Sequence, residues 1–173
     1  VEECSKFAID LGINIPTGKD SLSMKQKYSN YDVLSPGTVI ISAAGQCSNV
    51  KNIIKPVATA KGGEIFYVDF SQDEFYLGGS SFAQSQECIG NDTPGVTDPV
   101  YFKRAFNTVQ DHIKAGKISA GHDIGSGGLI TSLLEFCFPS LNIGMDLDFS
   151  CLEETDLVKI LFSEKVGLIL QSN

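Results

Sequence analysis

The chain has 173 residues, of which 42% are hydrophobic and 20% are charged. This composition excludes a disordered tail, because such a tail has too few apolar residues to form a core. Apolar runs such as Thr38–Gly45 are far shorter than the roughly 20 residues of a membrane-spanning helix. The net charge is −8, and Arg104 is the only arginine. We therefore expect neither a nucleic acid nor a membrane as partner.

The cysteines give no sign of a zinc site or a disulfide framework. There are five of them, an odd number, and no two form a C-x-x-C pair. We interpret them as reduced thiols, which predicts a reducing, cytoplasmic compartment. The chain starts at Val1 without Met, a basic n-region or an apolar h-region. We expect it to be cut from a longer polypeptide, with no signal peptide in view.

The first part of the chain is predicted to hold one helix and short extended segments. Apolar residues spaced by 3, 4 and 3 predict a helix over residues 1–11, with Gly12 as its C-cap. A short extended segment is expected at Leu22–Tyr28. Val39–Gly45 is apolar on both faces, which predicts a central strand. The character of the sequence changes after Asn49, so we place a domain boundary near residue 50.

The second part alternates between strand and helix patterns. Phe102, Phe106, Val109 and Ile113 have the spacing of an amphipathic helix that Gly116 ends. The other predicted elements are a strand at Glu64–Phe70, a helix at Phe82–Ile89, a strand from Ile118 leading to Asp123, a helix at Gly128–Phe138, a strand at Gly144–Phe149, a short helix from Thr155 or Asp156 to Phe162, and a strand at Val166–Gln171. Interleaved strands and helices predict the α+β class, of an α/β-like kind.

The first candidate site is the turn Thr17–Met24. It is not a P-loop, because Ile13 and Asp20 stand where that motif needs Gly and Ser or Thr. Gly18, Lys19, Asp20 and Ser21 nevertheless bring a glycine, an ammonium group, a carboxylate and a hydroxyl together, a set suited to a phosphate and its metal ion. The alternative is a solvated turn.

The second candidate is Gly121–Leu129, between a predicted strand and a predicted helix. Gly127 and Gly128 would let backbone N–H groups approach an anion at the helix N-terminus. Asp123 could hold Mg²⁺ against that anion. The alternative is a purely structural connection, in which His122 is a hydrogen-bonded partner rather than a base.

Two further features leave their role open. Leu77–Ser81 is a glycine-serine loop before a helix, which suits either an anion or a tight turn with a serine N-cap. Glu135 lies among apolar residues of a predicted helix. It is either a semi-buried carboxyl group with a raised pKa or one paired with a lysine or the backbone.

Several of these segments, in this order and spacing, resemble one known family. The segments are residues 15–25, 77–80, 120–129 and 134–138. Over essentially its whole length the chain is similar to the second half of the synthetase core in the large, single-chain phosphoribosylformylglycinamidine synthases. The resemblance implies a purine-biosynthetic ligase that uses ATP, Mg²⁺ and glutamine-derived ammonia to convert formylglycinamide ribonucleotide into formylglycinamidine ribonucleotide.

The resemblance also implies a domain organisation. Residues 1–50 would be the tail of an A-type synthetase domain. Residues 51–173 would be a B-type domain, the C-terminal domain of the aminoimidazole-ribonucleotide-synthetase-like superfamily, with a mixed sheet, packed helices and a truncated C-terminus. The expected partners are the remaining domains of the same polypeptide, namely the first synthetase half and the glutaminase domain.

For the sites, the resemblance implies that Asp123 binds Mg²⁺ together with the phosphates of ATP or ADP. It gives Lys19, Asp20 and Ser21 a ligand-contact role. The nucleotide site of this half would be auxiliary, so no catalytic residue is expected and the isolated fragment would be inactive. One departure is that Gly125 and Ser126 replace the usual Ser and Asp. The alternatives are a non-catalytic scaffold module and, third, a selenophosphate-synthetase-like or hydrogenase-maturation relative.

Overall fold

The computed structural model describes residues 1–19 and 23–173. They form two compact units, Val1–Ser48 and Asn49–Asn173, which we describe one at a time. The boundary between the units lies two residues before the one predicted near residue 50. In the described residues, no helix is long and apolar enough to cross a membrane.

The first unit contains one helix and one hairpin. Helix α1, Glu2–Leu11, ends at Gly12, whose left-handed conformation (φ 72°) lets its N–H reach the carbonyls of the last turn. This agrees with the predicted helix. Strands β1 (Lys25–Lys27) and β2 (Asp32–Leu34) pair antiparallel. β1 lies within the predicted extended segment, whereas β2 lies where no strand was predicted.

The central strand predicted at Val39–Gly45 is not formed. The segment pairs with no strand in the described part of the chain, and its large side chains face solvent, with Ile40 87% exposed. A strand that is apolar on both faces needs neighbours on both edges and cover on both faces. The described residues supply neither, so the prediction is wrong for this chain.

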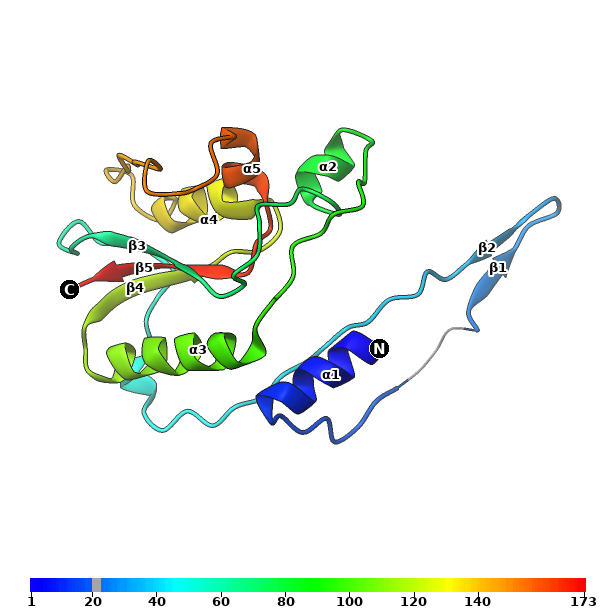
Figure 1. The fold of residues 1–173 in the computed structure, drawn as a ribbon, viewed down its shortest axis with the longest axis horizontal. Coiled ribbons are helices and arrows are strands. Elements are labelled where there is room, and N and C mark those ends of the chain that lie inside the picture. The colour runs from blue at the N-terminus through cyan, green and yellow to red at the C-terminus, as the bar shows by residue number, and fades with distance from the viewer. Residues whose placement is uncertain (20–22) are drawn as a thin grey trace. The chain divides into compact units, whose positions relative to one another are not determined.

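The second unit is built on an antiparallel sheet of order β3-β5-β4 (Figure 1). Its strands are β3 (Ile65–Asp69), β4 (Ile118–Asp123) and β5 (Gly167–Ser172). All three fall at predicted strands, and a parallel bridge joins Lys55 to Ala120 beside them. Because β5 is central, its neighbours in space come from distant parts of the sequence.

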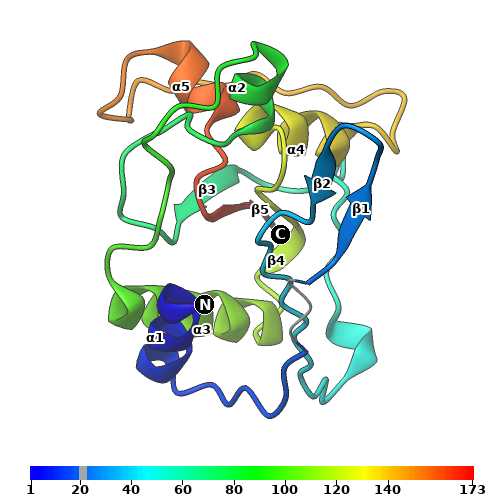
Figure 2. The ribbon, with the colours of Figure 1, turned by 90° about the vertical axis from the view of Figure 1, so that its right-hand side faces the viewer.

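Helices cover both faces of this sheet. Helix α3, Pro99–Lys114, lies on one face, and α4, Gly128–Cys137, lies on the other (Figures 1 and 2). The short helices α2 (Ser81–Ser85) and α5 (Leu157–Phe162) lie on the α4 side (Figure 2). A 3₁₀ turn, Val50–Asn52, opens the unit. The sheet and its helices confirm the α+β class.

Alternation along the strands divides the core in two. Ile169 and Ala120 face α4, where they meet Leu133 and Phe136. On the opposite face, the adjacent Leu170 packs with Phe70 and the α3 residue Val109. Helix α3 begins where the Asp98 carboxylate accepts hydrogen bonds from two N–H groups of the first turn, before Pro99 at N1.

The strand predicted at Gly144–Phe149 is also absent. Its alternation is real, because Met145 and Phe149 pack against the core cluster while Asp146 and Asp148 are exposed. In the described residues, however, the segment pairs with no strand. A period of two shows which side chains point inward, but it does not supply the neighbouring backbone that a strand needs.

Candidate functional site

The glycine turn between β4 and α4 carries the predicted metal ligand. Asp123 ends β4, and its side chain is 82% exposed. Its backbone carbonyl accepts hydrogen bonds from the Ser132 hydroxyl at 2.9 Å and from His122 Nδ1 at 2.6 Å. The main chain of Asp123 is therefore fixed, whereas its carboxylate is largely exposed, with Oδ1 3.7 Å from His122 Nδ1.

Gly127 and Gly128 form the turn itself, with φ values of 90° and 76°. A Cβ on Gly128 would lie 2.7 Å from the backbone carbon of Phe162, so this position needs glycine for space as well as for conformation. Both N–H groups have internal partners. Gly127 donates to Glu164 Oε1 at 2.8 Å and Gly128 donates to the Gly125 carbonyl at 3.0 Å.

The neighbouring Gly125 and Ser126 are exposed, and their N–H groups have no partner among the described residues. These two positions lie between Asp123 and the start of α4 at Gly128. A ligand anion could therefore meet two backbone donors here without breaking an internal bond. The N–H groups of Gly127 and Gly128, which the sequence favoured, would first have to leave their present partners.

His122 is held from both sides of its ring. Its Nδ1 lies 2.6 Å from the Asp123 carbonyl, which can only accept, so this nitrogen carries a proton. Its Nε2 lies 3.4 Å from Glu135 Oε2 on α4, and Phe136 packs edge-on against the ring. The structure therefore makes His122 a hydrogen-bonded partner through Nδ1 and places Glu135, rather than a lysine, beside Nε2, where the two form an ion pair when Nε2 also carries a proton.

The loop Leu77–Ser81 has the geometry of a tight turn with a serine N-cap. The buried Ser80 hydroxyl accepts from the Ala83 N–H at 3.1 Å and donates to the Leu77 carbonyl at 2.6 Å. The N–H groups of Gly78 and Gly79 bond to the carbonyls of Asp92 and Ile89. These donors are already used, which favours the structural interpretation of this loop.

The Gly-Lys segment belongs to the first unit. Gly18 and Lys19 are exposed, and a Cβ on Gly18 would meet nothing within 4 Å. Asp20 and Ser21 lie outside the described residues. The structure therefore describes Gly18 and Lys19 as exposed residues of the first unit that belong to no helix or strand.

Asp123 suits Mg²⁺ as a single protein ligand. This ion takes oxygen ligands, keeps several waters and is commonly bound by one or two carboxylates plus substrate phosphates. Within residues 1–19 and 23–173, no group of three or more His, Cys, Asp and Glu side chains is placed to hold a metal. This fits the replacement of the second expected carboxylate by Ser126. A metal here would depend on Asp123, water and phosphate oxygens.

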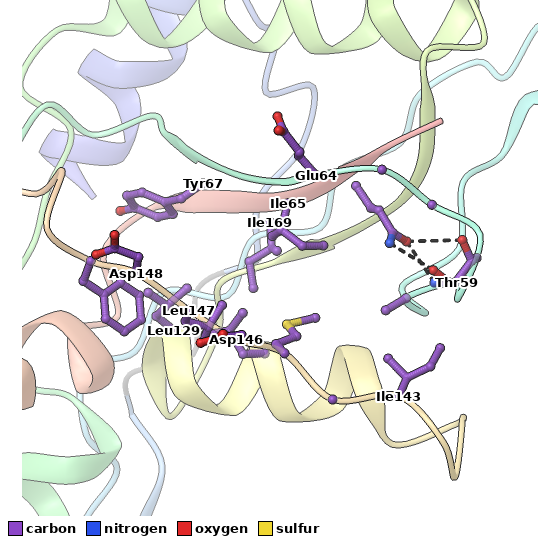
Figure 3. Close-up of a pocket in the computed structure, with 18 of the residues that line it drawn as sticks. Thr59, Glu64, Ile65, Tyr67, Leu129, Ile143, Asp146, Leu147, Asp148 and Ile169 are labelled. Carbon is purple, nitrogen blue, oxygen red and sulfur yellow. Dashed lines mark hydrogen bonds between the residues drawn. The ribbon is translucent and has the colours of Figure 1, made fainter.

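A separate cavity of about 750 Å³ lies between the sheet and the segment that follows α4. Ile65, Tyr67 and Ile169 point into it from the strands, and Leu129 and Leu147 line it from the other side (Figure 3). Burial, and then the charge of Asp69, raises the pKa of Tyr67. Apart from Leu129, at the end of the candidate segment Gly121–Leu129, none of the predicted site residues that the structure describes lines this cavity, and no sequence motif indicated it.

One end of the cavity is closed by side chain to backbone hydrogen bonds. Gln171 Oε1 accepts from the Thr59 N–H at 2.8 Å, and Gln171 Nε2 donates to the Thr59 carbonyl at 3.0 Å (Figure 3). The two residues are 112 positions apart in the chain. This pair fixes the entry segment of the second unit against the end of β5.

An ion pair that no sequence pattern predicted lies at the other end of β5. The Lys165 ammonium lies 2.9 Å from Asp69 Oδ2 and 4.3 Å from the centre of the Phe75 ring, with the lysine side chain only 7% exposed. Burial alone would raise the pKa of Asp69, but bonds to Lys165 and Ser71 outweigh it and lower that pKa. A charged residue next to the apolar run at Val166–Leu170 was the available signal.

Comparison with known proteins identifies the chain. The family model for the AIR synthase related protein, C-terminal domain, matches residues 76–170. The chain belongs to this family. The FGAR-AT PurM_N-like domain matches residues 1–46, so the two matches fall in different compact units.

Three curated relatives carry the name of a single enzyme. The chain is 40% identical over 169 residues to a probable phosphoribosylformylglycinamidine synthase, chloroplastic/mitochondrial, from Arabidopsis thaliana, covering 96% of this chain and 12% of that protein. It is 34% identical over 163 residues to the phosphoribosylformylglycinamidine synthase of Homo sapiens, covering 93% and 12%. It is 33% identical over 175 residues to the probable phosphoribosylformylglycinamidine synthase of Caenorhabditis elegans, and this match covers 94% of this chain and 13% of that protein.

The resemblance found in the motifs is thereby confirmed. The chain is homologous to a segment of the phosphoribosylformylglycinamidine synthases, and it spans about one eighth of the length of these relatives. It is related to the synthase of purine biosynthesis, and its match covers one part of these longer proteins.

Proposed function

We propose that this chain is part of the ligase that converts formylglycinamide ribonucleotide, ATP and glutamine-derived ammonia into formylglycinamidine ribonucleotide, and that it carries part of a Mg²⁺-nucleotide phosphate site. The carrying observation is the open carboxylate of Asp123 at the end of β4, beside a glycine turn that starts α4. The names of the relatives support the proposed reaction, and the geometry of the turn supports the proposed phosphate site.

Each residue has a separate role in the proposed site. Asp123 supplies a carboxylate oxygen to Mg²⁺, which neutralises phosphate charge. The N–H groups of Gly125 and Ser126 face the phosphates, while Gly127 and Gly128 shape the turn. For the first unit we keep, from the resemblance alone, the proposal that Gly18, Lys19, Asp20 and Ser21 contact a phosphate.

This site is auxiliary in the proposal, and the fragment has no activity alone. In the complete enzyme, ATP transfers its γ-phosphoryl group to the amide oxygen of the substrate and leaves as ADP; ammonia then attacks the carbon of the iminophosphate so formed and displaces phosphate. The first synthetase half and the glutaminase domain, as partners in the same polypeptide, supply those steps. We also propose a reducing, cytoplasmic location, because the cysteines among the described residues are all unpaired.

A non-catalytic scaffold is the second candidate. It is favoured by the internal hydrogen bonds of Gly127 and Gly128, and by those of Gly78 and Gly79 in the loop before α2. In a scaffold these glycines would only connect strands to helices, and the chain would act through contacts between domains.

Isothermal titration of ADP, with and without Mg²⁺, separates the two candidates. The chain should bind ADP in the presence of Mg²⁺, and Asp123→Asn should weaken binding at least tenfold. Asp146→Asn is the matched control, because Asp146 is also an exposed aspartate but lies by the separate cavity. No binding by the unaltered chain, or equal loss in both variants, would favour the scaffold.

A further inference from the structure

Glu164 joins the two glycine loops that the sequence singled out. Its Oε1 atom lies 2.8 Å from the N–H of Ser81 and 2.8 Å from the N–H of Gly127. The separations along the chain are 83 and 37 residues. One carboxylate oxygen therefore accepts from the start of α2 and from the turn before α4 at the same time.

The backbone that carries Glu164 is fixed on both sides. Ser163 is 1% exposed and its N–H bonds to the Lys159 carbonyl at 3.0 Å. Lys165, on the other side, is held in the buried pair with Asp69. Glu164 thus projects from a short, anchored connection between α5 and β5, which limits where its carboxylate can reach.

Contacts of Phe162 support the same connection. Its ring stacks on Phe82 of α2, with centroids 4.7 Å apart and 29° between the ring planes. Its backbone lies against Gly128, where an added Cβ would come within 2.7 Å. The end of α5 therefore packs on both α2 and the turn before α4, and the Glu164 hydrogen bonds lie between elements already in contact.

We propose that Glu164 is a positioning residue that holds the turn at Gly125–Gly128 in the shape needed beside Asp123 and couples that turn to the loop at Leu77–Ser81. This inference rests on the proposed function. It assigns a role in ligand binding to a residue that lies outside both glycine motifs.

The charge of Glu164 fits this role. Burial alone would raise its pKa, but the N–H of Ser81, the N–H of Gly127 and the Ser81 hydroxyl outweigh burial and hold the pKa below its usual range. These groups are the ones that face the carboxylate. Lys165, the adjacent charged residue, reaches Asp69 instead. The ionised form of Glu164 is therefore the form that joins the loops.

A pH titration followed by amide NMR tests, without any ligand, whether Glu164 joins the two loops. The Ser81 and Gly127 amide signals should move together, with one midpoint below the usual range of a glutamate. Glu164→Gln keeps an acceptor oxygen but cannot ionise, so both movements should disappear while the two amides stay protected. Separate midpoints, or unchanged titration in Glu164→Gln, would overturn the proposal, because Asp69 or another group would then be the source.

Mg²⁺-ADP titration tests the positioning role. Glu164→Ala should weaken binding at least tenfold, and Glu164→Gln should recover most of it, since the amide oxygen can still accept both hydrogen bonds. Gln171→Leu is the matched control, because it breaks the Thr59 bonds at the other end of β5. It should lower Tm and leave Kd unchanged.

The outcomes separate the two proposals. Binding to Glu164→Ala as tight as to the unaltered chain would refute the positioning role. If Gln171→Leu weakened binding as much as Glu164→Ala, general destabilisation would explain both variants and the role would again be refuted. If the unaltered chain bound no Mg²⁺-ADP, the proposed function would fail, and the role of Glu164 in ligand binding would fail with it. The amide titration would still decide whether Glu164 joins the loops.

Discussion

Replacing Gly128 by alanine tests whether this glycine is needed for the structure of the turn. Gly128 has φ 76°, and an added Cβ would lie 2.7 Å from the Phe162 carbonyl carbon and 2.8 Å from the Leu161 carbonyl oxygen. Both are backbone atoms, so no side-chain rotation relieves the overlap. Gly128→Ala should therefore force α4 and the end of α5 apart, or force the turn into another conformation.

The magnitude follows from two unfavourable effects. A left-handed conformation costs an L-residue about 1–2 kcal/mol, and overpacking in a close contact costs about 1–3 kcal/mol. Lower entropy of the unfolded chain offsets roughly 0.4–1 kcal/mol of this. We expect a loss of about 2–4 kcal/mol in the free energy of unfolding, or a Tm lower by roughly 5–15 °C for a chain of this size.

Urea and thermal unfolding measure this effect against two related variants. At Gly125, an added Cβ meets nothing within 4 Å, so Gly125→Ala should change the free energy by less than about 1 kcal/mol. At Gly127, the added Cβ would overlap with the Thr131 side chain, which can rotate, so the loss of stability should be intermediate. Equal stability of the Gly125→Ala and Gly128→Ala variants would refute the steric argument.

Three further substitutions probe the core, the ion pair and a helix cap. Phe136→Ala, at a fully buried site, should lower the free energy of unfolding by about 3–5 kcal/mol, measured with urea; a loss below about 1 kcal/mol would contradict this packing. The lowered pKa of Asp69 means that its stabilising effect is present above the usual aspartate pKa and is lost as pH falls through the folded pKa. Asp69→Asn should therefore reduce the acid-induced fall in Tm. If the Tm of this variant fell with acid as much as that of the unaltered chain, the result would argue against the Lys165 pair. Ser80→Ala should cost about 1 kcal/mol by leaving the Ala83 N–H without its cap, whereas an unaffected Tm would show that water replaces it.

The parts of the fold that could be predicted depend on local signals. Apolar spacing from Phe102 to Ile113 is sufficient for α3, because a helix is defined by neighbours three and four residues away. Gly12 and Asp156 act at helix ends, where the cap residue and its partners are adjacent in sequence. These elements need no information from distant parts of the chain.

Two predicted strands failed for the opposite reason. Val39–Gly45 and Gly144–Phe149 have strand-like patterns, and Met145 and Phe149 do point inward as the alternation indicates. Strand formation also requires a second backbone at hydrogen-bonding distance. The sequence pattern describes the faces of a segment, whereas its edges depend on residues elsewhere.

The candidate site shows the same limit in its chemistry. Asp123 could be picked out because it follows a strand and precedes a glycine turn, and these relations are local. The partner of the Gly127 N–H could not be predicted, because Glu164 is 37 residues away and lies next to no motif. The sequence thus indicates where donors gather, but tertiary contacts decide which of them are free.

This distinction changes how the glycine turn should be understood. If Gly127 and Gly128 donated to a phosphate, Glu164 would compete with that phosphate, since two anions would share one N–H group. In the proposed site, Glu164 keeps the Gly127 N–H occupied, so the N–H groups of the exposed Gly125 and Ser126 would meet the ligand, while Gly127 and Gly128 would shape the turn. The Glu164 carboxylate, which accepts the Gly127 N–H, then stabilises the turn. It does not take up the N–H groups of Gly125 and Ser126, which a Mg²⁺-bound phosphate would use.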